Sequence, residues 1–313
     1  MVELSPQEKG RIVFLVNPAS ANGSTHRRWP EIAHRAAVAG LRGETLVSER
    51  PGQIADFARQ ACKEGAELVV VVGGDGTVNE AVNGLMQVDP VHRAELAVLP
   101  RGTGTDFVRT FRIPTKLDEA IVVARSGQPR VLDVGRVSYT AWDGSPGASY
   151  FANVASAGMS GAVAQRANSS SKALGGKASF LWATLAVFSR WKNTDVTVDA
   201  DGEHRQARML DVIVANCQYL GGGMRMTPDA DPGDGLFDVL LIGDITKRDL
   251  VLTLPKTYRG THLPHPKAEL LRARTVAVDA RAPLPIELDG EQPGTTPATF
   301  EIVPQALRIR VPP

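Results

Sequence analysis

Asp75 lies inside a glycine-rich turn, where a carboxylate changes the chemistry that the turn can support. Gly73, Gly74 and Gly76 flank it, and Thr77 follows. Glycines let backbone N–H groups approach a ligand closely, and a helix that begins at such a turn adds a favourable potential for an anion. A carboxylate beside those N–H groups would repel a phosphate unless a metal ion, a proton or a hydroxyl lay between them. The turn therefore predicts metal-assisted phosphoryl chemistry rather than simple anion binding.

Two other loops carry polar side chains that could serve the same site. Arg101–Asp106 is a second glycine-rich turn, and Phe107 after it resumes an apolar helical face. Asp106 either stabilises the start of that helix or joins Asp75 in a metal network, and the residues alone favour neither interpretation. The loop Asn17–Ser20 offers Asn and Ser side chains that can contact a nucleotide. Taken alone, it is better interpreted as a loop that turns and caps the next helix.

Acidic residues are also dense in two later segments. Asp229–Asp238 carries four carboxylates in ten residues, which suits a hard cation such as Mg²⁺ or Ca²⁺. It lacks the closing Glu of the twelve-residue calcium loop, and a solvated turn is an alternative of about equal weight. Ile286–Glu291 places acids on either side of Gly290 at the end of a predicted strand. A plain hairpin turn would also contain Asp-Gly, so this segment alone is a weak indication of a site.

The elements that must position these turns alternate between strand and helix in the first part of the chain. The predicted strands are Arg11–Val16, Glu44–Val47, Leu68–Val72 and Leu96–Leu99. The predicted helices are Trp29–Ala39, Gln53–Glu64, Val78–Leu85 and a helix around Leu117–Arg125. This alternation predicts a doubly wound, mostly parallel α/β sheet with helices on both faces. Ligands bind beyond the carboxyl ends of the strands of such sheets, which is where the polar turns lie.

From about residue 131 the pattern changes to successive strands. We predict strands at Val131–Val137, Ala148–Asn153, Asp195–Val198, Met209–Ala215, Leu236–Ile242, Thr275–Asp279, Ile286–Leu288 and Leu307–Val311. Two helical stretches interrupt them, Ser171–Trp191 and Lys247–Tyr258. Strands with few helices between them predict an all-β, antiparallel sandwich or barrel-like domain. We place the boundary near Arg130–Val134, giving domains 1–133 and 134–313, and the last strand is free to return to the first domain.

Composition limits the class of protein. The chain has 313 residues, which favours two domains, and a net charge of +1, which argues against a general nucleic-acid binder. It contains no run of 18 apolar residues, so we expect no transmembrane span. The two cysteines, Cys62 and Cys217, are far apart and fit reduced thiols in a cytoplasmic protein.

Taken together, the turns point to one family. Between a strand and a helix, Gly73–Thr77 resembles the Gly-Gly-Asp-Gly-Thr signature of the superfamily that contains NAD kinases, 6-phosphofructokinases and lipid kinases of the diacylglycerol and sphingosine type. The chain resembles the diacylglycerol-kinase catalytic family over nearly its whole length, and no segment resembles the second motif of NAD kinases. The matching segments are Val16–Pro18 (VNP), Gly73–Glu80 (GGDGTxNE), Pro100–Arg109 (P-x-GTxND-F-x-R), Pro228–Gly235 (P-x-A-x-x-x-DG) and Leu288–Glu291 (DGE).

The resemblance implies a fold and a set of roles. It implies an N-terminal α/β nucleotide domain and a C-terminal β-sandwich, with the active site in the cleft between them. ATP-binding roles fall on Asn17, Ser48, Gly73, Gly74, Gly76, Thr77 and Thr103, and we assign Glu80, Gly290 and Glu291 to the same site. Asp231, Asp234 and the backbone carbonyl of Leu236 match a structural Mg²⁺ loop of bacterial members.

The resemblance leaves the general base open between two acids. Asp289 occupies the position of the family's proposed base, with Asp75 close to the γ-phosphate through Mg²⁺ and water. In the related sphingosine kinases, the acid at the position of Asp75 is itself a candidate base. Mg²⁺ would be oriented by Asp75, with Asp106 as a second candidate ligand. Thr105 departs from the family, which usually has Asn there, and the loop Ala19–Ser24 lacks the family's compact Ser-Gly.

We therefore expect an ATP- and Mg²⁺-dependent lipid kinase, with diacylglycerol as the substrate and phosphatidic acid as the product. Aromatic residues and flanking cations in Ser171–Trp191 fit a helix on an anionic bilayer, although a helix packed on the second domain is the stronger interpretation. The alternatives are a kinase for a sphingoid base, another lipid or a soluble alcohol, and a non-catalytic pseudokinase that binds lipid or nucleotide. The expected partner is a lipid at the cytoplasmic face of a membrane, and the possibility of a homodimer is left open.

Overall fold

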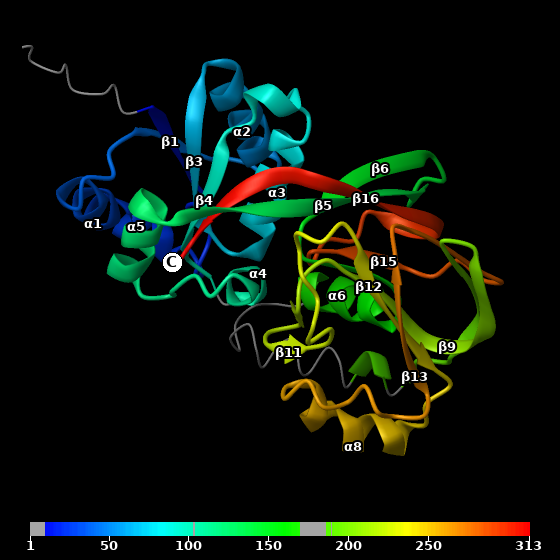
Figure 1. The fold of residues 1–313 in the computed structure, drawn as a ribbon. Coiled ribbons are helices and arrows are strands. Elements are labelled where there is room, and N and C mark those ends of the chain that lie inside the picture. Colours follow the sequence, from blue (N-terminus) through cyan, green and yellow to red (C-terminus); the bar gives the residue numbers. More distant parts are fainter. Residues whose placement is uncertain (1–9, 103, 170–185, 189) are drawn as a thin grey trace, which may run out of the picture.

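The first half of the chain forms a parallel sheet covered by helices on both faces (Figure 1). The structure, a computed structural model, describes residues 10–102, 104–169, 186–188 and 190–313. The strands of this half are β1 (Arg11–Val16), β2 (Glu44–Val47), β3 (Ala66–Gly73) and β4 (Glu95–Pro100). Its helices are α1 (Ser24–Val38), α2 (Gln53–Lys63), α3 (Asp75–Leu85), α4 (Asp106–Thr110) and α5 (Leu117–Ser126), with a 3₁₀ turn at Pro90–His92.

The alternation of side chains along β1 and β3 explains why both faces need a cover. Val13 and Leu15 pack with α2 and α3 on one face, whereas Phe14 and Val16 pack with α1 and α5 on the other. Because successive strand residues point to opposite faces, a strand that is apolar throughout must be buried on both sides. The strand order β4-β3-β1-β2 is parallel throughout, so the turns after β1, β3 and β4 share one edge. The predicted doubly wound fold is confirmed.

The second half is built from antiparallel strands around a separate core. Its long strands are β5 (Gln128–Ala141), β6 (Pro146–Phe151), β7 (Val154–Gly158), β8 (Thr194–Ala200), β9 (Glu203–Ala215), β12 (Phe237–Gly243), β13 (Ala268–Ala273), β14 (Thr275–Ala280) and β16 (Gly294–Val311). The short strands are β10 (Tyr219–Leu220), β11 (Met224–Arg225) and β15 (Ile286–Leu288). In the core, Phe151 stacks on Phe237 with centroids 5.6 Å apart and meets Phe300 edge-on at 6.2 Å. The predicted antiparallel β domain is confirmed.

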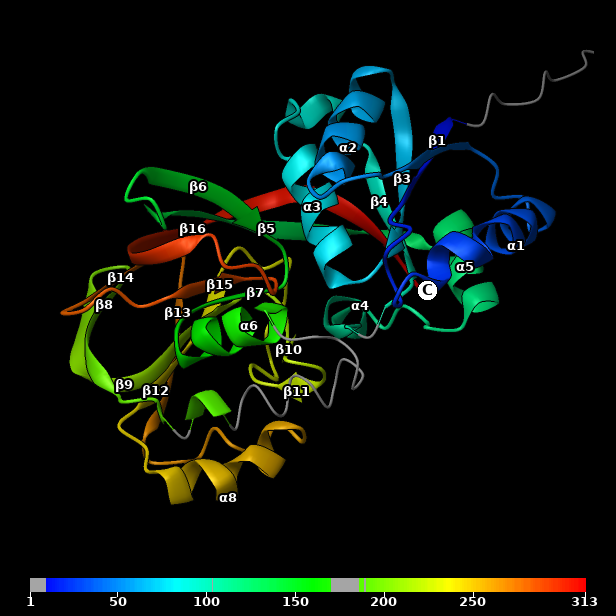
Figure 2. The ribbon, with the colours of Figure 1, turned by 180° about the vertical axis from the view of Figure 1, so that it is seen from behind.

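Two long strands join the halves. β16 pairs antiparallel with β5 along most of its length and parallel with β4 through Ile309 and Leu96, so one sheet runs from β13 to β2. Both views show β5 and β16 bridging the two halves (Figure 2). The division proposed between residues 133 and 134 falls inside β5 and stays a prediction, since the strand is continuous there.

The helices of the second half differ in part from expectation. α8 (Lys247–Thr257) agrees with the prediction to one residue, whereas α6 (Met159–Ser169) was not predicted. Gly161 weakens the helical pattern of this segment in the sequence. The structure explains why glycine is needed there, because a Cβ would lie 2.4 Å from the carbonyl oxygen of Pro285. The expected helix Ser171–Trp191 falls mostly outside the described residues. No helix in the described ranges is long and apolar enough to cross a bilayer.

Candidate active site

The turn between β3 and α3 leaves the start of α3 open to an anion. Gly74 precedes the helix and no side chain caps it. The first N–H groups of a helix have no intrahelical partners, and their potential favours an anion. Gly73 must be glycine, because a Cβ there would lie 2.4 Å from the Thr77 hydroxyl oxygen. The open helix start and the absence of side-chain bulk fit a phosphate group.

The turn after β4 packs directly on this first turn. The N–H of Arg101 donates to the carbonyl of Gly73 at 2.7 Å, and a Cβ on Gly102 would lie 3.0 Å from the Cα of Gly74. The N–H of Asp106 donates to Asp75 Oδ2 at 3.1 Å, so Asp75 holds the start of α4. Asp106 in turn accepts from the N–H of Gly222, in the second domain, at 2.6 Å. The structure thus brings both predicted acids together at the junction of the two domains.

Two more predicted nucleotide residues lie at the same sheet edge. Asn17 Nδ2 donates to the Thr77 hydroxyl at 3.0 Å, and Thr77 is buried. Ser48, after β2, is also buried, and its N–H bonds to the carbonyl of Val16 at 3.0 Å. Thr103 lies outside the described residues. Thr105 keeps its hydroxyl engaged, since it accepts from Arg109 Nε at 3.2 Å.

Glu80 and Glu291 have different surroundings. Glu80 accepts from the backbone N–H groups of Gly52 and Ile54, so it caps α2, and burial raises the pKa of its carboxyl. Glu80 therefore stabilises the start of α2, next to the turns predicted to bind the nucleotide. Glu291 is exposed and lies near α3, with its Oε1 3.8 Å from where a Cβ on Gly76 would be. The terminal Asp-Gly-Glu segment therefore meets the glycine-rich turn across the domain junction.

Asp289 is held by four hydrogen bonds. Its Oδ1 accepts from the N–H groups of Asn153 and Val154 at 3.0 and 2.9 Å. Its Oδ2 accepts from the N–H of Ala152 and from Asn79 Nδ2, both at 2.9 Å. Burial raises the pKa of the Asp289 carboxyl, and these four donors act to lower it. A carboxylate accepts about four hydrogen bonds, so this one is saturated.

Asp75 has a different electrostatic environment. Burial, and then the charges of Asp106 and Asp289, raise the pKa of Asp75 to about 7. Backbone hydrogen bonds from Asp106 and Phe107 act in the opposite direction. Because two neighbouring carboxyl groups raise the proton affinity of Asp75, a proton or a cation is favoured beside it.

The donor set fits a Mg²⁺ ion that arrives with a nucleotide. Mg²⁺ is usually held by one or two carboxylates together with substrate phosphates. Asp75 and Asp106 supply such carboxylates beside the open start of α3. In the part of the chain that the structure describes, no group of three or more His, Cys, Asp or Glu side chains forms a metal cage.

The predicted Mg²⁺ loop lies away from these acids. Asp231 pairs with Arg130 at 2.6 Å, Asp234 pairs with Arg272, and the N–H of Leu236 bonds to Asp234 Oδ1 at 3.0 Å. Arginine side chains thus neutralise two of the proposed ligands in this structure. The role of Asp231, Asp234 and the Leu236 carbonyl as a metal site remains a prediction.

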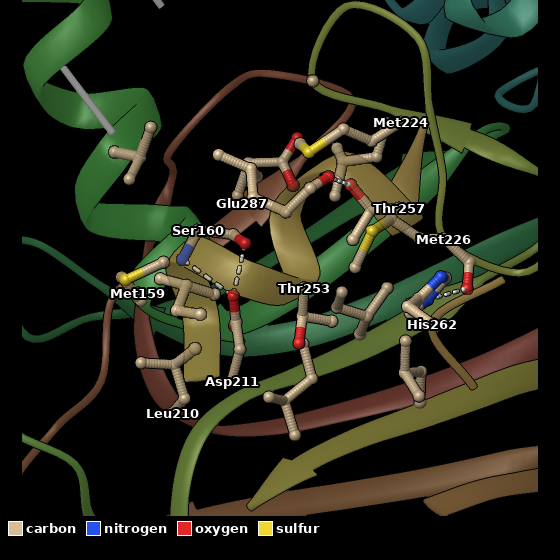
Figure 3. Close-up of a pocket in the computed structure, with 18 of the residues that line it drawn as sticks. Met159, Ser160, Leu210, Asp211, Met224, Met226, Thr253, Thr257, His262 and Glu287 are labelled. Carbon is tan, nitrogen blue, oxygen red and sulfur yellow. Dashed lines mark hydrogen bonds between the residues drawn. The ribbon is translucent and has the colours of Figure 1, made fainter. Parts of the chain in front are cut away.

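An apolar cavity of about 300 Å³ reaches from the acids into the second domain. Figure 3 shows side chains that line it there, among them Met159, Leu210 and Met226. Asp75, Asp106 and Asp289 line one part of it. The apolar side chains that line the rest include Met159, Val163, Leu210, Ile213, Leu220, Met224, Met226, Leu240, Ile242 and Leu254. A cavity of this kind fits a ligand with a long hydrocarbon portion.

Buried polar groups interrupt the apolar wall, and the sequence motifs did not indicate them. Asp211 accepts from the N–H of Ser160 at 2.9 Å and from its hydroxyl, and burial raises the pKa of Asp211 to about 7. Glu287 accepts from the N–H of Gly290, and burial raises its pKa to about 8. His262 Nε2 lies 3.1 Å from the carbonyl of Met226, and burial lowers its pKa. For Asp211, the sequence did contain a signal, because this acid stands alone in the apolar run Leu210–Ala215.

The comparisons with known proteins agree with this geometry. A family model described as the diacylglycerol kinase catalytic domain matches residues 11–137. A second, described as the YegS C-terminal NAD kinase beta sandwich-like domain, matches residues 153–311, about half of the chain. A diacylglycerol kinase of Staphylococcus carnosus is 27% identical over 306 residues, which cover 98% of this chain and 96% of that protein.

Solved structures show the same fold. A crystal structure of a diacylglycerol kinase from Bacillus anthracis superposes with a TM-score of 0.73 at 20% identity, over 98% of this chain and 99% of that one. Yeast NADH kinase complexed with NADH superposes with a TM-score of 0.53 at 13% identity, over 97% and 83% of the two chains. The predicted family resemblance is confirmed. The chain belongs to the family defined by the YegS C-terminal NAD kinase beta sandwich-like domain, its N-terminal part matches the diacylglycerol kinase catalytic domain, and it is a phosphotransferase that uses an alcohol group as its acceptor.

Proposed function

We propose that this lipid kinase transfers the γ-phosphate of ATP to the free hydroxyl of diacylglycerol, giving phosphatidic acid. The observation that carries the proposal is that one cavity is lined both by Asp75, Asp106 and Asp289 and by aliphatic side chains of β9, β12 and α8. A hydroxyl placed at the acids leaves its hydrocarbon chains among those aliphatic side chains. Because ATP is supplied inside the cell, we place the reaction at the cytoplasmic face of a membrane.

The nucleotide site follows from the sheet edge. The N–H groups at the start of α3 would bind the phosphates, and Asn17, Ser48 and Thr77 would lie along the nucleotide. Thr103 is proposed for the same role on the family motif alone. Mg²⁺, held by Asp106 beside Asp75, would supply neutralisation of the triphosphate charge.

Asp75 is the better candidate for the proton acceptor. The lipid hydroxyl oxygen forms a bond to the γ-phosphorus, the bond from that phosphorus to the β–γ bridging oxygen breaks, and the hydroxyl proton passes to Asp75. A base is most effective when its pKa is near the working pH, and the pKa of Asp75 is raised to about 7. Asp289 already accepts four hydrogen bonds, so its oxygens have no free position for the proton of the lipid hydroxyl, although burial raises its pKa.

Asp289 then serves to position the site. Through Asn79, it connects α3 to the strands of the second domain, where the lipid would lie. Asn83 adds to this connection, because its side chain both donates to and accepts from the backbone of Tyr150 at 2.9 Å. Gly290 and Glu291, which follow Asp289, are thereby held beside the glycine-rich turn.

The test is turnover of labelled ATP with Mg²⁺ and mixed micelles that contain diacylglycerol, monoacylglycerol, ceramide or sphingosine. We expect label in phosphatidic acid and its loss in Asp75→Asn. Label in a different lipid would keep the site and replace the substrate. Labelling of a soluble alcohol alone would overturn the lipid assignment, and bound ATP without any product would indicate a pseudokinase.

A further inference from the structure

α8 forms one wall of the apolar cavity mainly with one of its faces. Leu250, Thr253, Leu254 and Thr257 line the cavity, and their spacing of three and four residues places them on one stripe of the helix. Among the 11 residues of α8, all of which are described, Thr257 alone is buried. Most helices of a domain bury an apolar face, so the remaining apolar residues of α8 need another explanation.

The opposite face of α8 exposes large apolar side chains. Val251 is 58% exposed, Leu252 is 61% exposed, and Tyr258 at the end of the helix is 50% exposed. They are three of the nine large hydrophobic side chains exposed within the described ranges. At 100° per residue, Arg248 lies on the same side of the helix as these residues, and the exposed Arg259 follows in the turn that ends α8. We call these five residues the outer face of α8.

The charge around α8 is strongly asymmetric. The segment 244–267 contains five Lys and Arg residues and two Asp residues, so its net charge is +3, whereas the whole chain has a net charge of +1. The rest of the chain therefore has a net charge of −2. Asp249 is engaged at the start of α8, where it accepts from the N–H of Thr246 at 3.1 Å and lies 3.8 Å from Lys267 Nζ. Cations beside exposed apolar residues are typical of helices that lie on anionic membranes.

The position of α8 connects this face to the cavity. In both overall views, α8 lies at the outer edge of the second domain, away from the parallel sheet (Figures 1 and 2). Val251 lines the cavity and is also largely exposed, so the cavity reaches the surface beside the outer face. A lipid leaving a bilayer at this face would have a short apolar path to the cavity.

We propose that the outer face of α8 docks this protein on an anionic lipid bilayer. The inference rests on the proposed function, in that it names the surface through which a lipid substrate is collected. The apolar side chains enter the boundary between head groups and acyl chains, and Arg248 and Arg259 contact anionic head groups. Burying one Leu side chain and pairing one cation each contribute enough to be measured separately.

The experiment is sedimentation of the full-length protein with vesicles, without ATP and without diacylglycerol. Vesicles of phosphatidylcholine with phosphatidylglycerol are compared with pure phosphatidylcholine. We expect preference for the anionic vesicles, with binding weakened at least about tenfold by Leu252→Asp and about fivefold by Arg248→Ala. Val122→Asp on α5 is the matched control, because Val122 is 52% exposed in the first domain, and it should bind as the unaltered protein does.

The outcomes separate this inference from the kinase assignment. Vesicle binding does not depend on turnover, so loss of binding in Leu252→Asp supports the docking face even if no lipid is phosphorylated. Leu252→Asp should still phosphorylate a short-chain, water-soluble diacylglycerol, which shows that the variant is folded. Equal binding by Leu252→Asp and the control, or no binding of the unaltered protein to anionic vesicles, would overturn the inference.

Discussion

Asn79 and Asp289 are 210 residues apart in the chain, yet the Nδ2 of Asn79 donates to Oδ2 of Asp289 at 2.9 Å. This bond joins the helix behind the glycine-rich turn to the turn that ends β15. Asp289 also accepts from three consecutive backbone N–H groups, so it holds the short connection between β6 and β7 in place as well. The two domains therefore meet at a polar contact placed directly beside the proposed reaction centre.

Removing this contact should lower both stability and activity. We expect Asn79→Ala to reduce the free energy of unfolding by about 1.5–3 kcal/mol, the usual value of a hydrogen bond to a charged group. Asp289→Asn should lower the free energy of unfolding by about 3 kcal/mol, since the amide group of the introduced Asn would place N–H hydrogens against backbone N–H donors. Urea unfolding of the purified proteins measures both values.

The control for these variants is Asp118→Asn on the surface. Asp118 pairs with Arg35 where its side chain is 69% exposed, and exposed ion pairs contribute less than about 1 kcal/mol. An Asp289→Asn protein as stable as the unaltered one, but inactive, would return the role of proton acceptor to Asp289.

Asp75→Asn should separate catalysis from folding. The amide oxygen introduced by this substitution can still accept from the N–H of Asp106, so we expect the melting temperature to change little. The turnover number should fall about 10²–10⁴-fold, as it does when a general base is lost. ATP binding, measured by calorimetry, should persist, and its loss would instead assign Asp75 to nucleotide binding.

The pH profile gives a second test of Asp75. Its carboxyl accepts a proton only when ionised, and its pKa is raised to about 7. We therefore expect kcat/KM of the unaltered enzyme to rise with pH through about 7 and then level off. A flat profile between pH 6 and 8 would show that no group of this pKa limits the reaction.

Asp211 should make folding less favourable as pH rises. Its folded pKa is raised from 3.8 to about 7, so the folded state holds a proton that the unfolded state releases above pH 4. Stability from this group is complete below about pH 4 and is lost as pH rises through 7. Relative to the unaltered protein, Asp211→Asn should gain up to about 4 kcal/mol between pH 4 and 8.

The measurement is the difference in unfolding free energy between the two proteins at each pH. Taking the difference removes the contribution of Glu287, whose pKa is also raised, except for the part of that shift that the charge of Asp211 causes. A difference that does not change with pH would show that Asp211 is ionised in the folded protein.

Local patterns predicted those parts of the site that depend on neighbouring strands. Asn17 and Thr77 follow β1 and β3, which are adjacent and parallel, so their hydrogen bond follows from the sheet. The glycine turns and α4 could be placed in the same way. The alternation of strands and helices was therefore enough to predict which residues lie at this edge of the sheet.

Contacts across the domain junction could not be predicted in this way. The position of Asp289 beside Asn79 depends on how β16 returns to β4, and no local pattern specifies that pairing. Asp211 and Glu287 lie within apolar strands, where periodicity indicates burial but not what a buried acid contacts. Their partners, Ser160 and Gly290, come from other segments.

The length of the apolar cavity should determine which lipids are used. Leu254 of α8 lines the cavity and is only partly buried, so Leu254→Trp should fold while filling part of the space. We expect kcat/KM for long-chain diacylglycerol to fall about tenfold, the effect of about 1.4 kcal/mol of lost binding, with a smaller change for short chains. Leu252→Trp, two residues away on the outer face, is the control and should leave chain-length preference unchanged. Equal losses for all chain lengths in Leu254→Trp would show that the acyl chains lie elsewhere.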